Sequence, residues 1–361
     1  MSGNSDDYEA ALRSPAAETV ATFSERKGAV AHLQHALHVN PALIPLFVLV
    51  VSIIMFGLLL GSKFFSPFAL TLILQQVQIV GIVAAAQSLV ILTAGIDLSV
   101  GAIAVLSSVI MGQFTFRYGL PVEVAVAAGL IFGTLIGSLN GWLIAAMKLP
   151  PFIVTLGMWQ IVLAANFLYS KNATIRSQDI EQQAPLLQFL GTTFNIGADV
   201  DGRGGATFTY GVIAMVLIFA VLSYVLSQTA WGRHVYAVGD DPEAAQLSGV
   251  NVKRTIISVY AVTGFICAIA GWALIGRIGS VSPTSGQLLN IESITAVVIG
   301  GISLFGGRGS IMGPLFGALI VGVFTLGLRL AGADAQWTFL LIGALIIGAV
   351  AVDQWIRKVS A

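Results

Sequence analysis

The chain has 361 residues, of which 57% are hydrophobic and 9% are charged, and its formal net charge is zero. Soluble domains carry about 25% charged residues, so this chain cannot cover itself with a polar surface in water, and lipid must be the solvent for most of it. The neutral balance argues against a nucleic-acid partner, and the single cysteine, Cys267, excludes an internal disulfide and a multi-cysteine metal site.

The first 40 residues are polar and are predicted to form a cytoplasmic tail, followed by a single transmembrane domain over residues 41–361. A helix needs about 20 apolar residues to cross the hydrocarbon layer. This length predicts an all-α polytopic membrane protein with about ten transmembrane helices, within a range of about eight to eleven, some of them broken by glycine. The predicted spans are 43–61, 68–92, 98–116, 121–147, 152–170, 209–227, 255–276, 291–305, 311–330 and 336–353.

The distribution of basic residues predicts the orientation. Lys and Arg concentrate in short cytoplasmic loops. The bias is modest but favours both termini on the cytoplasmic side, which makes residues 171–208 a long outer loop and residues 228–254 an inner loop. The inner basic residues include Lys148, Arg233, Lys253, Arg254 and Arg308.

One carboxylate interrupts a long apolar region in the stretch Ile-Leu-Thr-Ala-Gly-Ile-Asp-Leu-Ser-Val-Gly, residues 91–101. Ionisable groups in the membrane are costly and usually face a cavity or a partner. Gly95 and Gly101 flank Asp97, so the helix can break here, with Asp97 or Ser99 capping the next helix. Asp97 is either a cap alone or also part of a gate or pathway, and the two roles can coexist.

A glycine stripe follows in the fourth predicted span. Gly129, Gly133, Gly137 and Gly141 recur every four residues, which gives one smooth helix face for close backbone contact. Packing within the subunit is favoured over a seam between two copies.

The inner loop contains a short helix with its own start and stop signals. Asp241 can cap the N-terminus, Pro242 suits the first helical position, and Gly249 suits the left-handed stop. The helix is either a simple connector or a knob that docks on a partner. Its pattern Glu-Ala-Ala, three residues, Gly resembles the coupling-loop motif of ATP-binding-cassette (ABC) import permeases, although the Ile-x-Leu-Pro ending of the maltose type is absent. The resemblance implies that the ATPase contacts lie at Glu243, Ala244, Ala245 and Gly249, beside the helix start at Asp241 and Pro242.

A second glycine-rich break lies at residues 298–310, Val-Ile-Gly-Gly-Ile-Ser-Leu-Phe-Gly-Gly-Arg-Gly-Ser. Its Gly-Ile-Ser-Leu, residues 301–304, resembles Gly-Ile-Asp-Leu, residues 95–98, and places Ser303 where Asp97 stands. Paired broken helices frame the transport pathway in many transporters. The pathway or gate candidates are therefore Gly95, Asp97, Ser99, Gly101, Ser303, Gly306 and Gly307.

Three stretches together carry a family resemblance over residues 70–353: TAGIDLSVGAI, GRHVYAVGDDPEAAQLSGV and VIGGISLFGGRGS. In this order they resemble the permeases of ribose, xylose, arabinose and related sugar importers, and within that family the rhizobial fructose type. The resemblance implies a permease subunit in the bacterial inner membrane, paired with a second permease copy and surrounded by lipid. It implies two further partners, an ABC ATPase subunit and a periplasmic sugar-binding protein. The implied cargo is a monosaccharide, fructose or a ribose- or xylose-like sugar, moved by alternating access.

Sugar recognition requires hydroxyl partners and often a flat ring. The candidates are Gln87, Asn140, Trp159, Gln160 and Asn166. The sequence has no catalytic constellation, no metal site and no cofactor motif, and it lacks the Gly-Lys-Ser/Thr phosphate loop. The chain is therefore predicted not to be an enzyme, and a separate subunit must hydrolyse ATP.

Two alternatives remain open at this point. A proton- or sodium-coupled secondary sugar carrier would not need the capped loop helix and would tend to bury more ionisable groups than Asp97 alone. An ABC permease for branched-chain amino acids or nucleosides is a distant relative that these residues do not exclude.

Overall fold

The structure is a computed structural model that describes residues 42–197 and 205–360. The predicted polar tail, residues 1–40, lies outside the described residues. Residues 41–361 group into one unit, and the elements below all belong to it.

Within residues 42–197 and 205–360, seven helices are long and apolar enough to cross a membrane. They are α3 (Leu43–Leu60, extended by η2, Gly61–Lys63), α4 (Pro67–Leu92), α6 (Val122–Met147), α7 (Pro151–Ser170), α9 (Tyr210–Gln228), α12 (Val252–Ile278) and α14 (Met312–Leu330). Three further predicted spans coincide with helices whose apolar parts are shorter, α5 (Val100–Phe116), α13 (Leu289–Ile299) and α15 (Ala335–Ser360). The expectation of an all-α polytopic membrane protein is confirmed, while the number of crossings and the orientation stay predictions.

The glycine stripe of α6 packs against α12 within the chain. A Cβ added at Gly133 would lie 2.7 Å from the Gly264 carbonyl oxygen, and one at Gly141 would lie 2.8 Å from the Ile257 Cα. The two backbones are therefore in direct contact, and α12 also packs against α4 and α5. The stripe therefore packs within the chain, which is the interpretation that the sequence analysis favoured.

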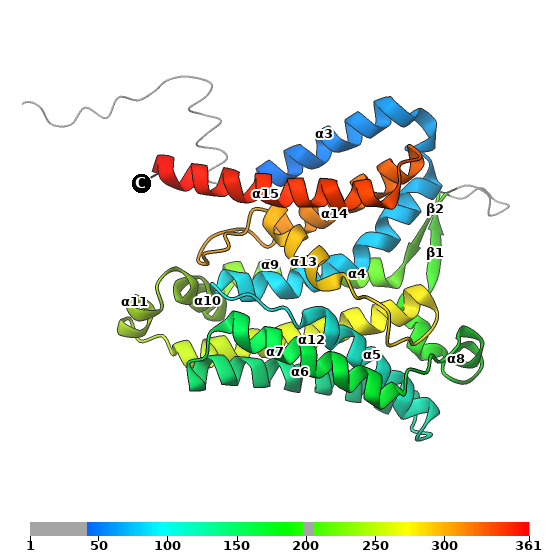
Figure 1. Cartoon of the computed structure of the whole chain (residues 1–361), viewed down its shortest axis with the longest axis horizontal. Coiled ribbons are helices and arrows are strands. Elements are labelled where there is room, and N and C mark those ends of the chain that lie inside the picture. Colours follow the sequence, from blue (N-terminus) through cyan, green and yellow to red (C-terminus); the bar gives the residue numbers. More distant parts are fainter. Residues whose placement is uncertain (1–41, 198–204, 361) are drawn as a thin grey trace, which may run out of the picture. The chain divides into compact units, whose positions relative to one another are not determined.

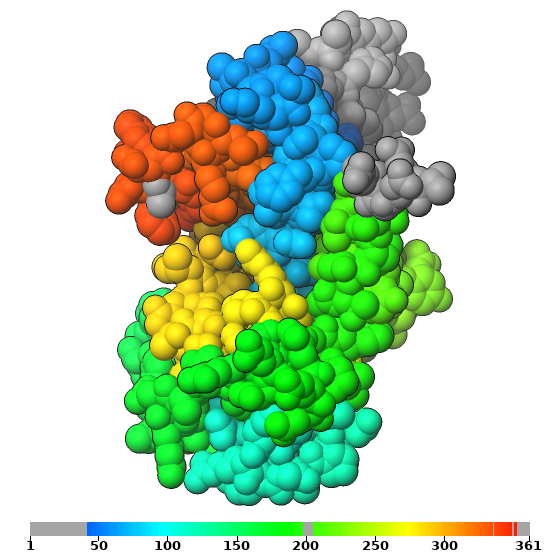
Figure 2. Space-filling model, turned by 90° about the vertical axis from the view of Figure 1, so that its right-hand side faces the viewer, coloured from blue at the N-terminus to red at the C-terminus, as the bar shows by residue number. Residues whose placement is uncertain are grey.

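One end of the helices carries the connection predicted as the outer loop (right in Figure 1). It forms α8 (Ser177–Gln183), η3 (Pro185–Gly191) and a two-stranded antiparallel hairpin of β1 (Thr193–Ile196) and β2 (Ala206–Thr209). Ile175 and Val281 join this connection to the segment after α12 through a β-bridge. Figure 2 faces this end and shows the yellow segment around residue 281 beside the green connection.

The opposite end carries α10 (Ala230–Asp240) and α11 (Pro242–Leu247) (left in Figure 1). Both non-helical breaks, residues 93–99 and 300–311, contact this end through backbone groups described below. The predicted span 291–305 is wrong at its C-terminal end, because α13 stops at Ile299. Gly301, Gly306 and Gly307 then adopt positive φ angles of 77°, 82° and 68°. Glycine adopts such angles readily, and they lie outside the right-handed helical region.

Candidate functional site

The two broken segments end their helices in the same way. After α4, the Gly95 N–H donates to the Val90 carbonyl at 3.0 Å, and after α13 the Ile302 N–H donates to the Val297 carbonyl at 3.3 Å. Each bond spans a residue of positive φ, Ala94 at 59° and Gly301 at 77°, which is the Schellman ending of a helix. The left-handed residue of the first break is therefore Ala94, not the glycine that the sequence match aligned with Gly301.

In both breaks, a side-chain oxygen then accepts a hydrogen bond from the backbone N–H two residues later. The Ser99 N–H donates to Asp97 Oδ1 at 2.7 Å, and the Phe305 N–H donates to Ser303 Oγ at 3.2 Å. Asp97 and Ser303, which the sequence match aligns, thus each accept a hydrogen bond from the backbone two residues later. The first break is one residue longer between its left-handed residue and its turn.

Asp97 is completely buried in a network of polar groups. Its Oδ1 also accepts from the Ser99 hydroxyl at 2.6 Å, and the Asn140 amide donates to that hydroxyl at 3.0 Å. Gln87, oriented so that both its amide atoms are satisfied, donates to the Asp97 carbonyl at 3.0 Å and accepts from the Asp97 N–H at 3.3 Å. Two of the sugar-contact candidates, Gln87 and Asn140, therefore hold the break in place.

The cap of α5 comes from another helix. The Ser99 side chain makes no capping bond, and the Asp97 carboxylate accepts from Ser99 itself, so the expectation that either residue caps α5 is wrong. Instead, Asn290 of α13 accepts the Gly101 N–H at 2.7 Å. The sequence could not reveal this cap, since the two residues are 189 positions apart.

Two more helices reach the first break. The Thr155 hydroxyl of α7 donates to the Ile96 carbonyl at 2.9 Å, and a Cβ at Gly95 would lie 2.9 Å from the Tyr260 hydroxyl of α12. The Tyr260 hydroxyl and Asp97 Oδ2 are buried without a hydrogen-bond partner among the described residues. Side chains of α7 and α12 therefore meet at the break between α4 and α5.

The three motif stretches converge at α10. The Gly307 N–H donates to the Leu92 carbonyl at 3.0 Å. Gly239 is packed so tightly that an added Cβ would overlap the same carbonyl oxygen and lie 2.7 Å from the Gly307 nitrogen. A Cβ at Gly306 would lie 2.7 Å from the Ala94 Cβ. Backbone contacts thus join α10 to both breaks.

Tyr236 adds a side-chain link to this three-way contact. Its hydroxyl donates to the Gly309 carbonyl at 2.9 Å, and burial raises the pKa of Tyr236. Neither Tyr236 nor Gly239 was among the candidates predicted from the sequence. The signal that could have found Gly239 is its position at the C-terminal end of an otherwise helix-forming segment, directly before Asp240-Asp241-Pro242.

The short helix in the inner loop has the predicted signals. Asp241 Oδ1 accepts from the N–H groups of Glu243 at 2.9 Å and Ala244 at 3.0 Å. Gly249 ends the helix with φ 87°. Ala245 is buried, whereas the Leu247 side chain is 90% exposed. A capped six-residue helix therefore exposes one large apolar side chain, Leu247.

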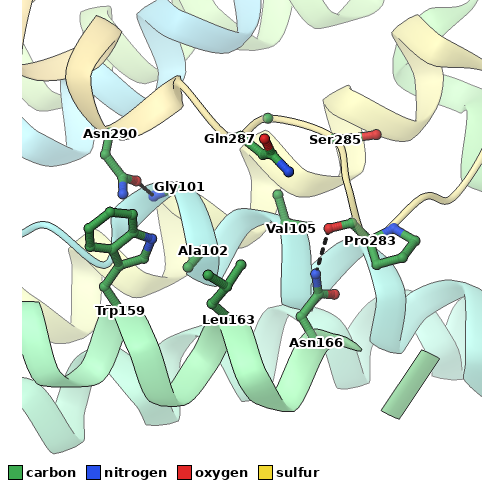
Figure 3. A pocket seen from close by; sticks show the side chains of 11 residues that line it. Gly101, Ala102, Val105, Trp159, Leu163, Asn166, Pro283, Ser285, Gln287 and Asn290 are labelled. Carbon is green, nitrogen blue, oxygen red and sulfur yellow. Dashed lines mark hydrogen bonds between the residues drawn. The ribbon is translucent and has the colours of Figure 1, made fainter. Parts of the chain in front are cut away.

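The remaining sugar-contact candidates all lie on α7, but they do not all lie on the same face of this helix. Trp159 and Asn166 line a partly open recess (Figure 3). Gln160 is exposed on a different face of the helix. Among the described residues, no group of His, Cys, Asp and Glu side chains could hold a metal ion.

Comparison with known proteins identifies the family. Residues 69–350 match the family described as branched-chain amino acid transport system / permease component. The chain belongs to this permease family. No solved structure matches it.

Individual relatives align with most of the permease. It is 68% identical over 357 residues, 99% of this chain and 97% of the relative, to the fructose import permease protein FrcC of Rhizobium meliloti. It is 37% identical to the ribose import permease protein RbsC of Bacillus subtilis, covering 88% of this chain and 92% of the relative. The xylose transport system permease protein XylH of Escherichia coli (strain K12) is 32% identical over 80% of this chain and 85% of the relative.

These relationships confirm that the chain is a multi-pass permease subunit of the inner membrane and not an enzyme. Permeases of this family work with a separate ATPase subunit and a substrate-binding partner, as the motifs predicted.

Proposed function

We propose that this permease imports fructose across the bacterial inner membrane as part of an ATP-driven ABC importer. The observation that carries the proposal is the 68% identity to a fructose import permease over 99% of the chain. The more distant ribose and xylose permeases support a monosaccharide as the cargo. The family description names branched-chain amino acids, which makes them the first alternative cargo to test.

The α10–α11 end is proposed to face the cytoplasm. Arg233, Lys253, Arg254 and Arg308 belong to the segments at this end, and basic residues favour the cytoplasmic side. Counting α5, α13 and α15 as crossings gives about ten spans with both termini inside. The end that carries α8 and the β1–β2 hairpin then faces the periplasm, where a sugar-binding protein delivers the cargo.

The ATPase subunit is proposed to bind α11, with Leu247 entering a groove on its surface. Docking would remove from water an apolar side chain that is now 90% exposed, and burying a leucine is worth about 1.5–3 kcal/mol. Movement of α11 reaches α10 through Asp240 and Asp241, and α10 contacts both breaks through Gly239. Closure of the ATPase can therefore reposition the Asp97 segment without a long relay.

Replacing Leu247 with aspartate is expected to reduce ATP-driven uptake about tenfold or more, because the apolar contact is lost and a charge must be desolvated. The permease itself should fold normally, because Leu247 makes little contact within the chain. Uptake and co-purification of the ATPase subunit are the measurements, with Leu247→Met as the matched apolar control. Normal uptake and normal co-purification of the aspartate variant would contradict docking through Leu247.

A second copy of the permease is proposed to pack against α7, with lipid covering the other apolar faces. The exposed side of α7 includes Ile153, Gly157, Ile161 and Leu168, and Gln160 is the polar residue among them. An amide facing lipid is costly, whereas a partner helix can satisfy it. Native mass spectrometry of the purified complex should therefore find two permease chains.

The transport proposal is tested with the permease, its ATPase and its binding protein produced together. Fructose uptake is expected to persist in membranes treated with an uncoupler and supplied with ATP, because hydrolysis and not a proton gradient drives it. Collapse of uptake with the uncoupler would indicate a secondary carrier. Uptake of leucine without uptake of fructose would indicate the amino-acid alternative.

A further inference from the structure

A recess lies between α5, α7 and the segment that joins α12 to α13 (Figure 3). Gly101, Ala102 and Val105 of α5 line one part of it, and Trp159, Leu163 and Asn166 of α7 line another. Residues from Pro283 to Asn290 complete it. About 310 Å³ of empty space lies in and in front of the recess, and part of this space is open solvent, so a ligand here would lie in a partly open hollow.

One buried polar atom at the recess, Asn166 Oδ1, has no partner in the described part of the chain. Asn166 is 1% exposed; its amide nitrogen donates to the Pro283 carbonyl at 2.8 Å, but its Oδ1 accepts no bond. Asn290 is 5% exposed, and its Oδ1 is already taken by the Gly101 N–H. Its Nδ2 remains as a donor and points toward Trp159 (Figure 3). Buried polar atoms are costly unless they are paired, so this recess is suited to a ligand rich in hydrogen-bonding groups.

The chemistry of the lining selects against charged ligands. All the residues that line the recess are uncharged, and they combine an indole ring with three amide side chains, Asn166, Gln287 and Asn290. An amino acid would have to bury its ammonium and carboxylate groups without an opposite charge, which is expensive. A monosaccharide has no charge, presents hydroxyl groups that both donate and accept, and can place an apolar ring face against an aromatic side chain.

We propose that this recess is a sugar subsite of the permease, in which the hydroxyl groups of a monosaccharide bind Asn166 and Asn290 and its ring lies against Trp159. The inference rests on the proposed sugar import and adds the place where the sugar binds within the permease. Asn290 also caps α5 directly after the Asp97 break. A sugar bound to Asn290 is therefore linked through this cap to the first break, which α10 contacts.

Cysteine protection tests the subsite directly in membranes that contain the complete importer. The native Cys267 is completely buried, so a cysteine introduced at the exposed position Gln287 should be the main target of a maleimide. Saturating fructose is expected to slow labelling of Gln287→Cys at least about threefold, because bound sugar covers the thiol. Labelling of Ala173→Cys, an exposed position at the same end but outside the recess, should not change. Equal labelling rates at Gln287→Cys with and without fructose would overturn the subsite.

Uptake kinetics separate this inference from the proposed function. Trp159→Ala is expected to reduce fructose uptake about tenfold while membrane abundance stays normal, because the flat ring contact is lost. Trp159→Phe should restore much of the uptake, and Trp142→Ala, an exposed tryptophan on α6, serves as the control. Normal uptake by Trp159→Ala, with fructose import intact, would reject the subsite alone. Absence of fructose import by the native complex would reject the proposed function.

Discussion

Replacing Gly239 with alanine is expected to reduce fructose uptake at least about tenfold, although the change adds a single methyl group, because overpacking a closed contact costs typically 1–3 kcal/mol. The added Cβ would overlap the Leu92 carbonyl oxygen and lie 2.7 Å from the Gly307 nitrogen. Both neighbours are backbone atoms, so no side chain can turn aside to make room. The contact between α10 and both breaks must open.

The measurement is ATP-driven fructose uptake together with ATPase activity and membrane abundance. ATPase activity is expected to persist while uptake falls, since α11, the helix proposed to bind the ATPase, is intact and only its connection to the breaks is disturbed. Gly343→Ala on α15 is the matched control, because an added Cβ there meets no atom within 4 Å. Uptake by Gly239→Ala equal to that of the control would show that the contact does not transmit movement.

The elements that the sequence predicted well are those determined by neighbouring residues. The helix α11 has its cap, proline and glycine within nine residues, from Asp241 to Gly249, and each behaves as local rules require. The glycine stripe of α6 likewise identifies a close helix contact from its spacing alone. The partner helix α12 could not be identified in this way, because a stripe of small residues does not encode what packs against it.

The details of the breaks depend on distant residues and were predicted less well. Asp97 and Ser99 have the residue types of helix caps, yet their side chains bond to each other, and the cap is supplied by Asn290. Gln87 and Asn140 were selected as polar groups in apolar helices. Sequence alone could not separate a role in holding Asp97 from a role in contacting sugar, because their partners are set by the tertiary fold.

Helical geometry could have shown from the sequence which candidates on α7 share one face of the helix. Trp159, Leu163 and Asn166 are spaced i, i+4 and i+7 and therefore share one face of α7. Gln160 is one residue from Trp159, which rotates it by about 100° around the helix. The third side of the recess comes from the connection after α12 and from Asn290 at the start of α13. The connection has no periodic pattern, so only the fold could place it beside α7.

Replacing Asp97 with alanine is expected to lower both membrane abundance and fructose uptake. The change leaves the buried Ser99 N–H and hydroxyl without the acceptor that they share, and each unsatisfied buried donor costs about 1–3 kcal/mol. A loss of this size would open the first break and reduce uptake by at least about tenfold. Uptake and the amount of folded permease after detergent extraction are the measurements.

Asp97→Asn is the decisive companion variant, because it keeps the Oδ1 acceptor for Ser99 and removes the charge. Its new amide nitrogen takes the place of Oδ2, an atom that has no partner among the described residues. We expect this variant to retain abundance and most of the uptake, since the carboxylate acts by accepting two hydrogen bonds that hold the break between α4 and α5. An asparagine variant that is abundant and folded but as inactive as Asp97→Ala would show instead that transport requires the negative charge itself.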